Sequence, residues 1–150
     1  MKIGIVVINW NGLELLKKYL KKIVDNSPDQ KIYVIDNNSK DESLKYIKEN
    51  HNNVRIISLN KNFGFAEGYN IGIQEVKEDY LCIINNDVEV TKDWLEPIKE
   101  RLNNYPDSII QPKILNLNNA NYFEYAGAAG GLSLIHISEP TRPRLISYAV

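Results

Sequence analysis

The sequence predicts an α/β domain built on a mostly parallel β-sheet with helices on both faces. Strand-like apolar runs alternate with helical segments from residue 2 to residue 84, and this alternation implies right-handed crossovers between parallel strands. The run at residues 80–84 is β-prone throughout, which is typical of a strand covered on both faces. A length of 150 residues is about that of one domain with a real core.

Each element is predicted from its own residue pattern. The strands are short β-prone runs at residues 2–9, 31–35, 54–59, 80–84 and 108–114, of which the last contains Pro112 and is expected to be an edge or bulged strand. Capping boxes are expected to begin three helices, at Asn11 with Glu14, Ser39 with Glu42, and Asp93 with Glu96. A further helix is predicted at residues 65–76, where Gly68 and Gly72 are best explained by close packing against the sheet.

Composition narrows the class of protein. With 18 basic and 19 acidic residues, the net charge of −1 provides no basic field that would attract nucleic acid, so no nucleic-acid partner is expected. The apolar runs are strand-length and the N-terminus lacks a signal-peptide cleavage site, which predicts a cytoplasmic protein without a transmembrane segment. The single cysteine, Cys82, excludes an internal disulfide and is expected to be buried.

A cluster of short polar side chains follows the strand at residues 80–84. Asn85, Asn86 and Asp87 come at its carboxyl end, and ligands of open α/β sheets bind outside the carboxyl ends of the strands. Asp87 is the carboxylate best placed to hold a metal-bound phosphate group. Taken alone, the tripeptide is more typical of a turn than of a metal site, because Asn and Asp bond their own backbone.

Other loops are expected to meet at the same rim of the sheet. Asn9 and Asn11 follow the first strand, and Asp36 follows the second, where it could bond a ribose or a base or simply be a turn or cap residue. The backbone N–H groups near Gly64, before the helix at residues 65–76, could face an anion. The chain contains no P-loop motif and lacks the three glycines of a dinucleotide fingerprint.

Four segments in this order and spacing make a family resemblance specific: VVINWNG, VIDNNSKDES, NKNFGFAEGYNIGI and INNDVEV. Together they resemble the donor-binding half of a family 2 glycosyltransferase of GT-A fold. They are most similar to the rhamnosyltransferase-like members that build bacterial surface polysaccharides. The resemblance covers residues 1–131, and we expect these residues to form the N-terminal, donor-binding part of such an enzyme, with the fold incomplete.

The resemblance implies a set of site residues. It places Asn9 and Asn11 along the nucleotide, Asp36 at the base or ribose, and Asn62, Gly64 and Asn70 beside the diphosphate. Asn85, Asn86 and Asp87 stand where the family carries an Asp-x-Asp motif. Because asparagine occupies the first position, Asp87 is the expected principal ligand of Mg²⁺ or Mn²⁺, which would stabilise the leaving diphosphate.

The implied activity is that of a hexosyltransferase, inverting and metal-dependent. It would transfer sugar from a UDP- or dTDP-sugar to a glycan or lipid-linked acceptor in polysaccharide biosynthesis. The expected location is the cytoplasm, with peripheral association at the inner face of the membrane left open for the full-length protein. One alternative is a non-catalytic nucleotide or nucleotide-sugar binding module, and another is a protein that keeps the sheet only for interaction.

The end of the chain differs in composition from the rest. Residues 132–150 contain no lysine and no asparagine, whereas residues 1–131 are rich in both. The segment also resembles translated adapter or vector sequence, so we expect a non-native tail on a truncated gene product; the alternative is a native linker with Pro140 and Pro143. The family's general base is expected beyond residue 131, and Glu124 is the nearest stand-in, so this fragment is predicted to be inactive.

Overall fold

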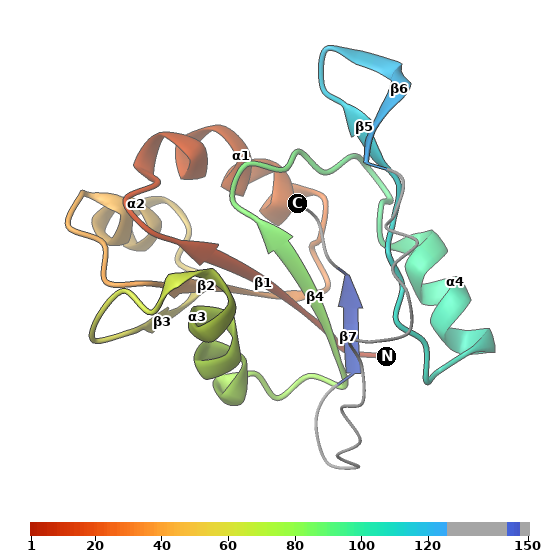
Figure 1. Cartoon of the computed structure of the whole chain (residues 1–150), viewed down its shortest axis with the longest axis horizontal. Helices are drawn as coiled ribbons and strands as arrows, with labels where there is room; N and C mark the ends of the chain where they lie inside the picture. The colour runs from red at the N-terminus through yellow and green to blue at the C-terminus, as the bar shows by residue number, and fades with distance from the viewer. Residues whose placement is uncertain (126–143, 148–150) are drawn as a thin grey trace.

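Within residues 1–125 and 144–147, the part of the chain that the computed structural model describes, five parallel strands form the central sheet (Figure 1). The strands are β1 (Ile3–Asn9), β2 (Lys31–Asp36), β3 (Arg55–Ser58), β4 (Tyr80–Asn85) and β7 (Arg144–Ser147). Their order is β3-β2-β1-β4-β7, and every neighbouring pair is parallel. The predicted parallel α/β sheet is therefore confirmed.

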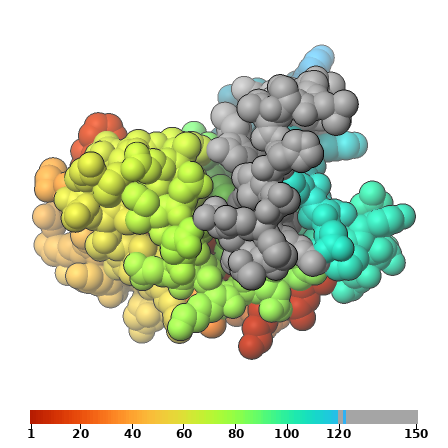
Figure 2. All heavy atoms as spheres, turned by 60° about the horizontal axis from the view of Figure 1, so that its bottom comes forward, coloured from red at the N-terminus to blue at the C-terminus, as the bar shows by residue number. Residues whose placement is uncertain are grey.

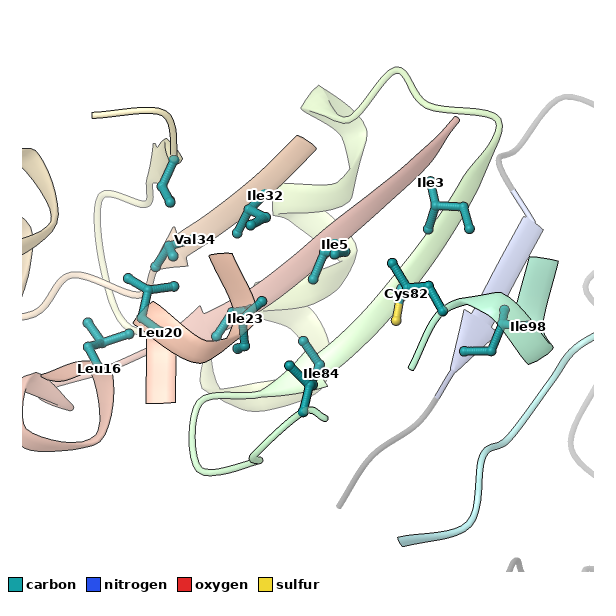
Figure 3. Packing of buried hydrophobic residues seen from close by; sticks show 14 of the residues in the cluster. Ile3, Ile5, Leu16, Leu20, Ile23, Ile32, Val34, Cys82, Ile84 and Ile98 are labelled. Atoms are coloured by element: carbon teal, nitrogen blue, oxygen red, sulfur yellow. The ribbon is translucent and has the colours of Figure 1, made fainter. Parts of the chain in front are cut away.

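Helices cover both faces of the sheet, as predicted. They are α1 (Leu13–Asp25), α2 (Ser43–Asn50), α3 (Gly64–Gly72), the 3₁₀ turn η1 (Ile73–Glu75) and α4 (Glu96–Asn104). Apolar side chains of α1, α2 and α4 form one core cluster with alternate residues of β1, β2 and β4 (Figure 3). Side chains of α3 pack in a second cluster on the opposite face of the sheet. Figure 2, which brings the α3 side forward, shows the yellow-green α3 region and the teal α4 region on opposite sides of the view.

The continuous apolar runs are explained by burial on two faces. All seven residues of β1 are buried, and Ile5 packs in the α1 cluster while Val6 packs in the α3 cluster. Full burial of one such side chain stabilises the fold by about 1.5–3 kcal/mol. The thiol of Cys82 is buried as predicted, and burial raises its pKa to about 12. None of the helices in the described ranges is long and apolar enough to cross a membrane.

The predicted capping boxes are wrong. The residues that immediately precede α1, α2 and α4 are Gly12, Glu42 and Leu95, and none of them makes a side-chain capping bond. The first turn of α1 uses a partner from another loop instead: the N–H of Leu13 donates to Oδ2 of Asp41 at 3.0 Å. At α2 the N–H of Ser43 donates to Oδ1 of Asp41, two residues earlier, at 3.1 Å. Pro97 lies in the first turn of α4, where its missing N–H costs least.

The predicted fifth strand is also misplaced. Residues 108–113 are not a strand, and β5 (Ile114–Asn116) begins only after Pro112, which cannot donate to a ladder. β5 forms an antiparallel hairpin with β6 (Asn119–Tyr125), apart from the main sheet. The place beside β4 is taken by β7, from the segment interpreted as a tail. The rest of that segment and the side chain of Glu124 lie outside the described residues.

A buried carboxylate closes the amino-terminal end of the sheet, opposite the carboxyl ends of the strands. Glu78 accepts a hydrogen bond from the Tyr33 hydroxyl at 2.8 Å, and its other oxygen lies 2.7 Å from Nζ of Lys31. Burial by itself would raise the pKa of Glu78, but the hydrogen bonds from Lys31 and Tyr33 outweigh burial and hold the pKa below its ordinary value. Burial and the same hydrogen bond raise the pKa of Tyr33 to about 12.

We expect Glu78→Gln to lower the free energy of unfolding by about 1 kcal/mol at pH 7, because a charged acceptor becomes a neutral one. The folded-state pKa of Glu78 is depressed, so its stabilisation is complete above the ordinary glutamate pKa and is lost as the pH falls through the folded-state value. Urea denaturation should therefore show that the free energies of unfolding of the wild-type and Glu78→Gln proteins converge as the pH falls from 7 to 3. The exposed Glu75→Gln is the control, and a difference that is independent of pH would contradict the prediction.

Candidate functional site

A groove of about 440 Å³ lies at the carboxyl ends of β1 and β4. Its walls come from the ends of β1, β2 and β4, the start of α1 and the loop that leads into α3. The lining residues are Ile8, Asn9, Trp10, Leu15, Asn37, Asn62, Gly64, Phe65, Asn85, Asn86 and Asp87. Because β1 pairs with β2 on one side and β4 on the other, the groove lies at the switch point of the strand order, where ligands of open α/β sheets bind.

The groove gathers most of the residues predicted for the site. Asn9, Asn62, Gly64, Asn85, Asn86 and Asp87 all line it. Asn11, Asp36 and Asn70 do not. Asn70 is exposed on α3, and Asn11 lies in a left-handed conformation with φ of 49° and accepts the Lys40 N–H at 2.7 Å. Direct contact of these three residues with a nucleotide remains a prediction.

Asp36 is buried behind the groove. Its side chain is 2% exposed, and Oδ2 accepts the backbone N–H of Ser39 at 3.1 Å. Oδ1 is buried and has no hydrogen-bond partner among the described residues. The turn role that the sequence left open for Asp36 is therefore present, and a ligand contact would have to use the unpaired Oδ1.

Asn37, which was not among the predicted site residues, holds the loop before α3. Its Nδ2 donates to Oδ1 of Asn62 and to the carbonyl of Gly64, both at 2.8 Å, and its Oδ1 accepts the Phe63 N–H at 2.9 Å. The Gly64 N–H donates to Oδ1 of Asn62 at 2.7 Å, so in this structure it is engaged within the loop. Gly64 has φ of +75°, the left-handed region that favours glycine. These bonds fix one wall of the groove.

Tyr69 of α3 ties β1 to β4 directly beneath the groove. Its hydroxyl accepts the N–H of Ile8 at 3.2 Å and donates to the carbonyl of Ile84 at 2.9 Å. Tyr69 is buried, with only 4% of the residue exposed. The hydroxyl contacts, which link two strands, carry no signal in the local sequence.

The oxygen atoms of the groove suit a hard divalent cation. Asp87 is exposed and is the only charged residue in the described lining. Oδ1 of Asn85, two residues earlier, is buried and has no hydrogen-bond partner among the described residues. The described ranges contain no cluster of three His, Cys, Asp or Glu side chains. One carboxylate with amide oxygens fits an ion such as Mg²⁺, which often takes one or two carboxylates and completes its shell with phosphate and water.

Relatives of this chain are named as enzymes that build glycans and teichoic acid. It is 29% identical over 74% of its length to a teichoic acid poly(glycerol phosphate) polymerase of Staphylococcus epidermidis. It is 26% identical over 76% to a low-salt glycan biosynthesis hexosyltransferase of Haloferax volcanii, and 26% identical over 81% to a probable N-acetylgalactosaminyltransferase of Caenorhabditis elegans. The chain spans 16%, 37% and 21% of the lengths of these relatives, respectively.

Solved structures show the same fold. S. aureus TarS 1-349 matches with a TM-score of 0.69 at 17% identity, over 79% of this chain and 37% of that one. The mannosyltransferase PcManGT from Pyrobaculum calidifontis matches with a TM-score of 0.65 at 16% identity, over 80% and 37% of the two chains. The predicted GT-A fold is therefore confirmed. The profile of glycosyl transferase family 2 matches residues 4–141, and the chain belongs to this family.

Proposed function

We propose that this chain binds the nucleotide-sugar donor of a metal-dependent, inverting hexosyltransferase that extends a surface polysaccharide or related glycan. The observation that carries the proposal is the groove at the switch point of the sheet, where Asp87 follows β4. Related folds support it: TarS was crystallised with UDP and with UDP-GlcNAc, and PcManGT with GDP-Man and Mn²⁺. The acceptor would be a glycan or a lipid-linked glycan, reached at the inner face of the membrane.

Residues of the groove have distinct proposed roles. Asp87, with the unpaired Oδ1 of Asn85, would hold a Mg²⁺ or Mn²⁺ ion. When bound, the ion stabilises the negative charge that develops on the leaving nucleoside diphosphate. Because the described lining contains no lysine or arginine, the protein itself offers no positive side chain there for that charge. Neutral amides of the lining other than Asn9 would orient the donor, and the apolar side chains of Trp10 and Phe65 would exclude water from parts of the groove.

A general base for the acceptor hydroxyl is not found in the described lining. Asp87 is the only carboxylate there, and its proposed role is to hold the ion. We therefore propose that the 150-residue chain binds donor without transferring it. The second candidate is a nucleotide-binding module without catalysis, and it predicts the same binding of nucleotide by this chain. The two candidates differ in the full-length protein, which should transfer sugar if the chain belongs to an enzyme and should not if it is a binding module.

Calorimetric titration with UDP, dTDP and GDP tests the proposal. We expect at least one of these nucleoside diphosphates to bind in Mn²⁺, and to bind more weakly in EDTA. A parallel assay with nucleotide sugars should detect no transfer by residues 1–150. Absence of binding by all three nucleotides with Mn²⁺ would rule out the donor-binding role, and turnover by this chain would show that a base is present.

We propose separately that residues 132–150 are a non-native tail. Their composition supports a non-native tail, whereas the family match continues to residue 141 and β7 pairs with β4. The β4–β7 pairing is short, and its register shifts between Leu81 and Cys82. The genomic reading frame after Gly131 decides the matter: the same residues in the genome would make the segment native.

A further inference from the structure

Side-chain hydrogen bonds join the carboxyl ends of β1, β2 and β4 beside the groove. Asn86, after β4, donates from Nδ2 to Oδ1 of Asn9 at 3.1 Å. Asn9, at the end of β1, donates from its own Nδ2 to Oγ of Ser39 at 3.2 Å. Asn9 is only 1% exposed, and both ends of its carboxamide are used within the protein. We call Asn86, Asn9 and Ser39 the strand-end relay.

Ser39 anchors the relay to the loop after β2. Besides the bond from Asn9, its Oγ accepts the backbone N–H of Asn11 at 2.9 Å, and its own N–H donates to Asp36 at 3.1 Å. One hydroxyl oxygen therefore accepts from two donors that belong to the end of β1 and the loop after it. Removing that oxygen would leave the buried Nδ2 of Asn9 without this partner, which costs more than the bond itself contributes, whereas water can replace it at the exposed N–H of Asn11.

Gly12 leaves the space that the relay occupies. A Cβ atom on Gly12 would lie 2.3 Å from Oδ1 of Asn9 and 2.6 Å from Nδ2 of Asn86, the two atoms that bond to each other. A larger residue at this position would have to push the two amides away. The local packing is thus fitted to this one arrangement of Asn9 and Asn86.

Asp87 depends on its neighbours for its position. It is exposed, and no hydrogen bond from the described residues orients its side chain. The residue before it, Asn86, is held by the relay at a turn. Fixing Asn86 therefore limits where the backbone of Asp87 can lie, and with it the carboxylate that faces the groove.

We propose that Ser39 and Asn9 are positioning residues that act through Asn86 to place the Asp87 carboxylate for a divalent cation. This inference rests on the proposed function, because it concerns the same cation and nucleoside diphosphate. Asn9 then serves the site from inside the protein rather than by touching the nucleotide. Partners that orient a metal ligand from outside its coordination shell commonly change metal affinity by about 10- to 100-fold when lost.

Ser39→Ala tests the proposal, with Ser39→Thr as the variant that keeps the hydroxyl. Ser43→Ala is the matched control, because Ser43 is a buried serine on α2 outside the relay. The measured quantity is the ratio of UDP affinities with Mn²⁺ and with EDTA, by calorimetry. We expect Ser39→Ala to lower this ratio by about 10-fold or more, and the other two variants to keep the wild-type ratio. A merely structural role would lower thermal stability without changing the ratio.

A measurement without nucleotide separates failure of this inference from failure of the proposed function. In ¹⁵N spectra, Ser39→Ala should shift or broaden the side-chain amide of Asn86 and the backbone amide of Asp87, whereas Ser43→Ala should not. Unchanged signals, or an unchanged Mn²⁺ ratio in Ser39→Ala, would overturn the inference. If the wild-type chain binds no nucleoside diphosphate, the proposed function fails. Titration of Mn²⁺ alone against the wild-type and Ser39→Ala proteins then tests the positioning role, and equal Mn²⁺ affinities of the two proteins would overturn it.

Discussion

Replacing Asp87 with alanine is expected to abolish the Mn²⁺-dependent gain in nucleoside diphosphate affinity while leaving the fold intact. Asp87 is the only carboxylate in the described lining of the groove, so its loss leaves only neutral oxygens for the ion. Loss of an outer-shell partner already costs about 10- to 100-fold in metal affinity, and loss of the principal ligand should cost about 100-fold or more. The side chain is exposed, so its removal leaves no cavity and no buried unpaired group.

Calorimetry with Mn²⁺ and with EDTA measures this effect, and circular dichroism checks the fold. Glu89→Ala is the matched control: it removes the same charge from the segment after β4, but Glu89 pairs with Lys22 at 2.6 Å and does not line the groove. The control should keep its metal dependence. Equal affinities of the wild-type protein in Mn²⁺ and in chelator, or an Asp87→Ala variant that keeps the wild-type ratio, would remove Asp87 from its proposed role.

The strands could be predicted because burial on two faces leaves a direct trace in the sequence. β1 and β4 are apolar along nearly their whole length, and no other local structure of that length explains such runs between polar loops. The helix starts could not be predicted in the same way. Asn11 and Ser39 have the residue types of caps, but their side chains bond across loops, to Lys40 and Asn9. A local pattern does not contain the partner from a distant loop.

The sequence identified the loops that form the groove, but not every residue that lines it. Asp36 and Asn37 are adjacent, yet Asp36 is buried behind the groove and Asn37 lines it. Both residues are buried, but successive side chains of a strand point to opposite faces, so the end of a strand can be identified correctly while the groove-lining residue is missed by one position. Asn37 bonds to Asn62 and Gly64, which lie 25 and 27 residues further along the chain. Contacts over such a distance are revealed only by the fold.

Gly68 and Gly72 of α3 pack closely against the sheet, as the sequence predicted. Close packing is confirmed at both positions: a Cβ atom on Gly72 would lie 2.3 Å from Cδ1 and 2.5 Å from Cγ1 of Ile35, and one on Gly68 would lie 2.6 Å from Cδ1 of Ile8. Ile35 is completely buried in β2, whereas Ile8 lines the groove. The two glycines therefore face different parts of the same sheet.

Gly72→Ala is expected to lower the free energy of unfolding by about 2 kcal/mol. Alanine is better than glycine in a helix by about 1 kcal/mol, which would stabilise α3. Overpacking a tight core costs about 1–3 kcal/mol, and the upper end applies here because the clash involves Cγ1 of Ile35 as well as the side-chain tip. The clash should outweigh the helix propensity. Urea denaturation measures the change, and the exposed Asn70→Ala, which gains propensity without a clash, should not destabilise the protein.

Comparing Gly68→Ala with Gly72→Ala distinguishes an effect on core packing from an effect on the groove. The added methyl group would press on Ile8 and lie 3.2 Å from Nδ2 of Asn37, the atom that holds the loop before α3. We therefore expect Gly68→Ala to weaken nucleoside diphosphate binding as well as stability, and Gly72→Ala to weaken stability alone. The reason is that Ile8 and Asn37 line the groove and Ile35 does not. Equal binding by both variants would show that the groove adjusts to a shift of α3, and a stable Gly72→Ala protein would show that Ile35 has room to repack.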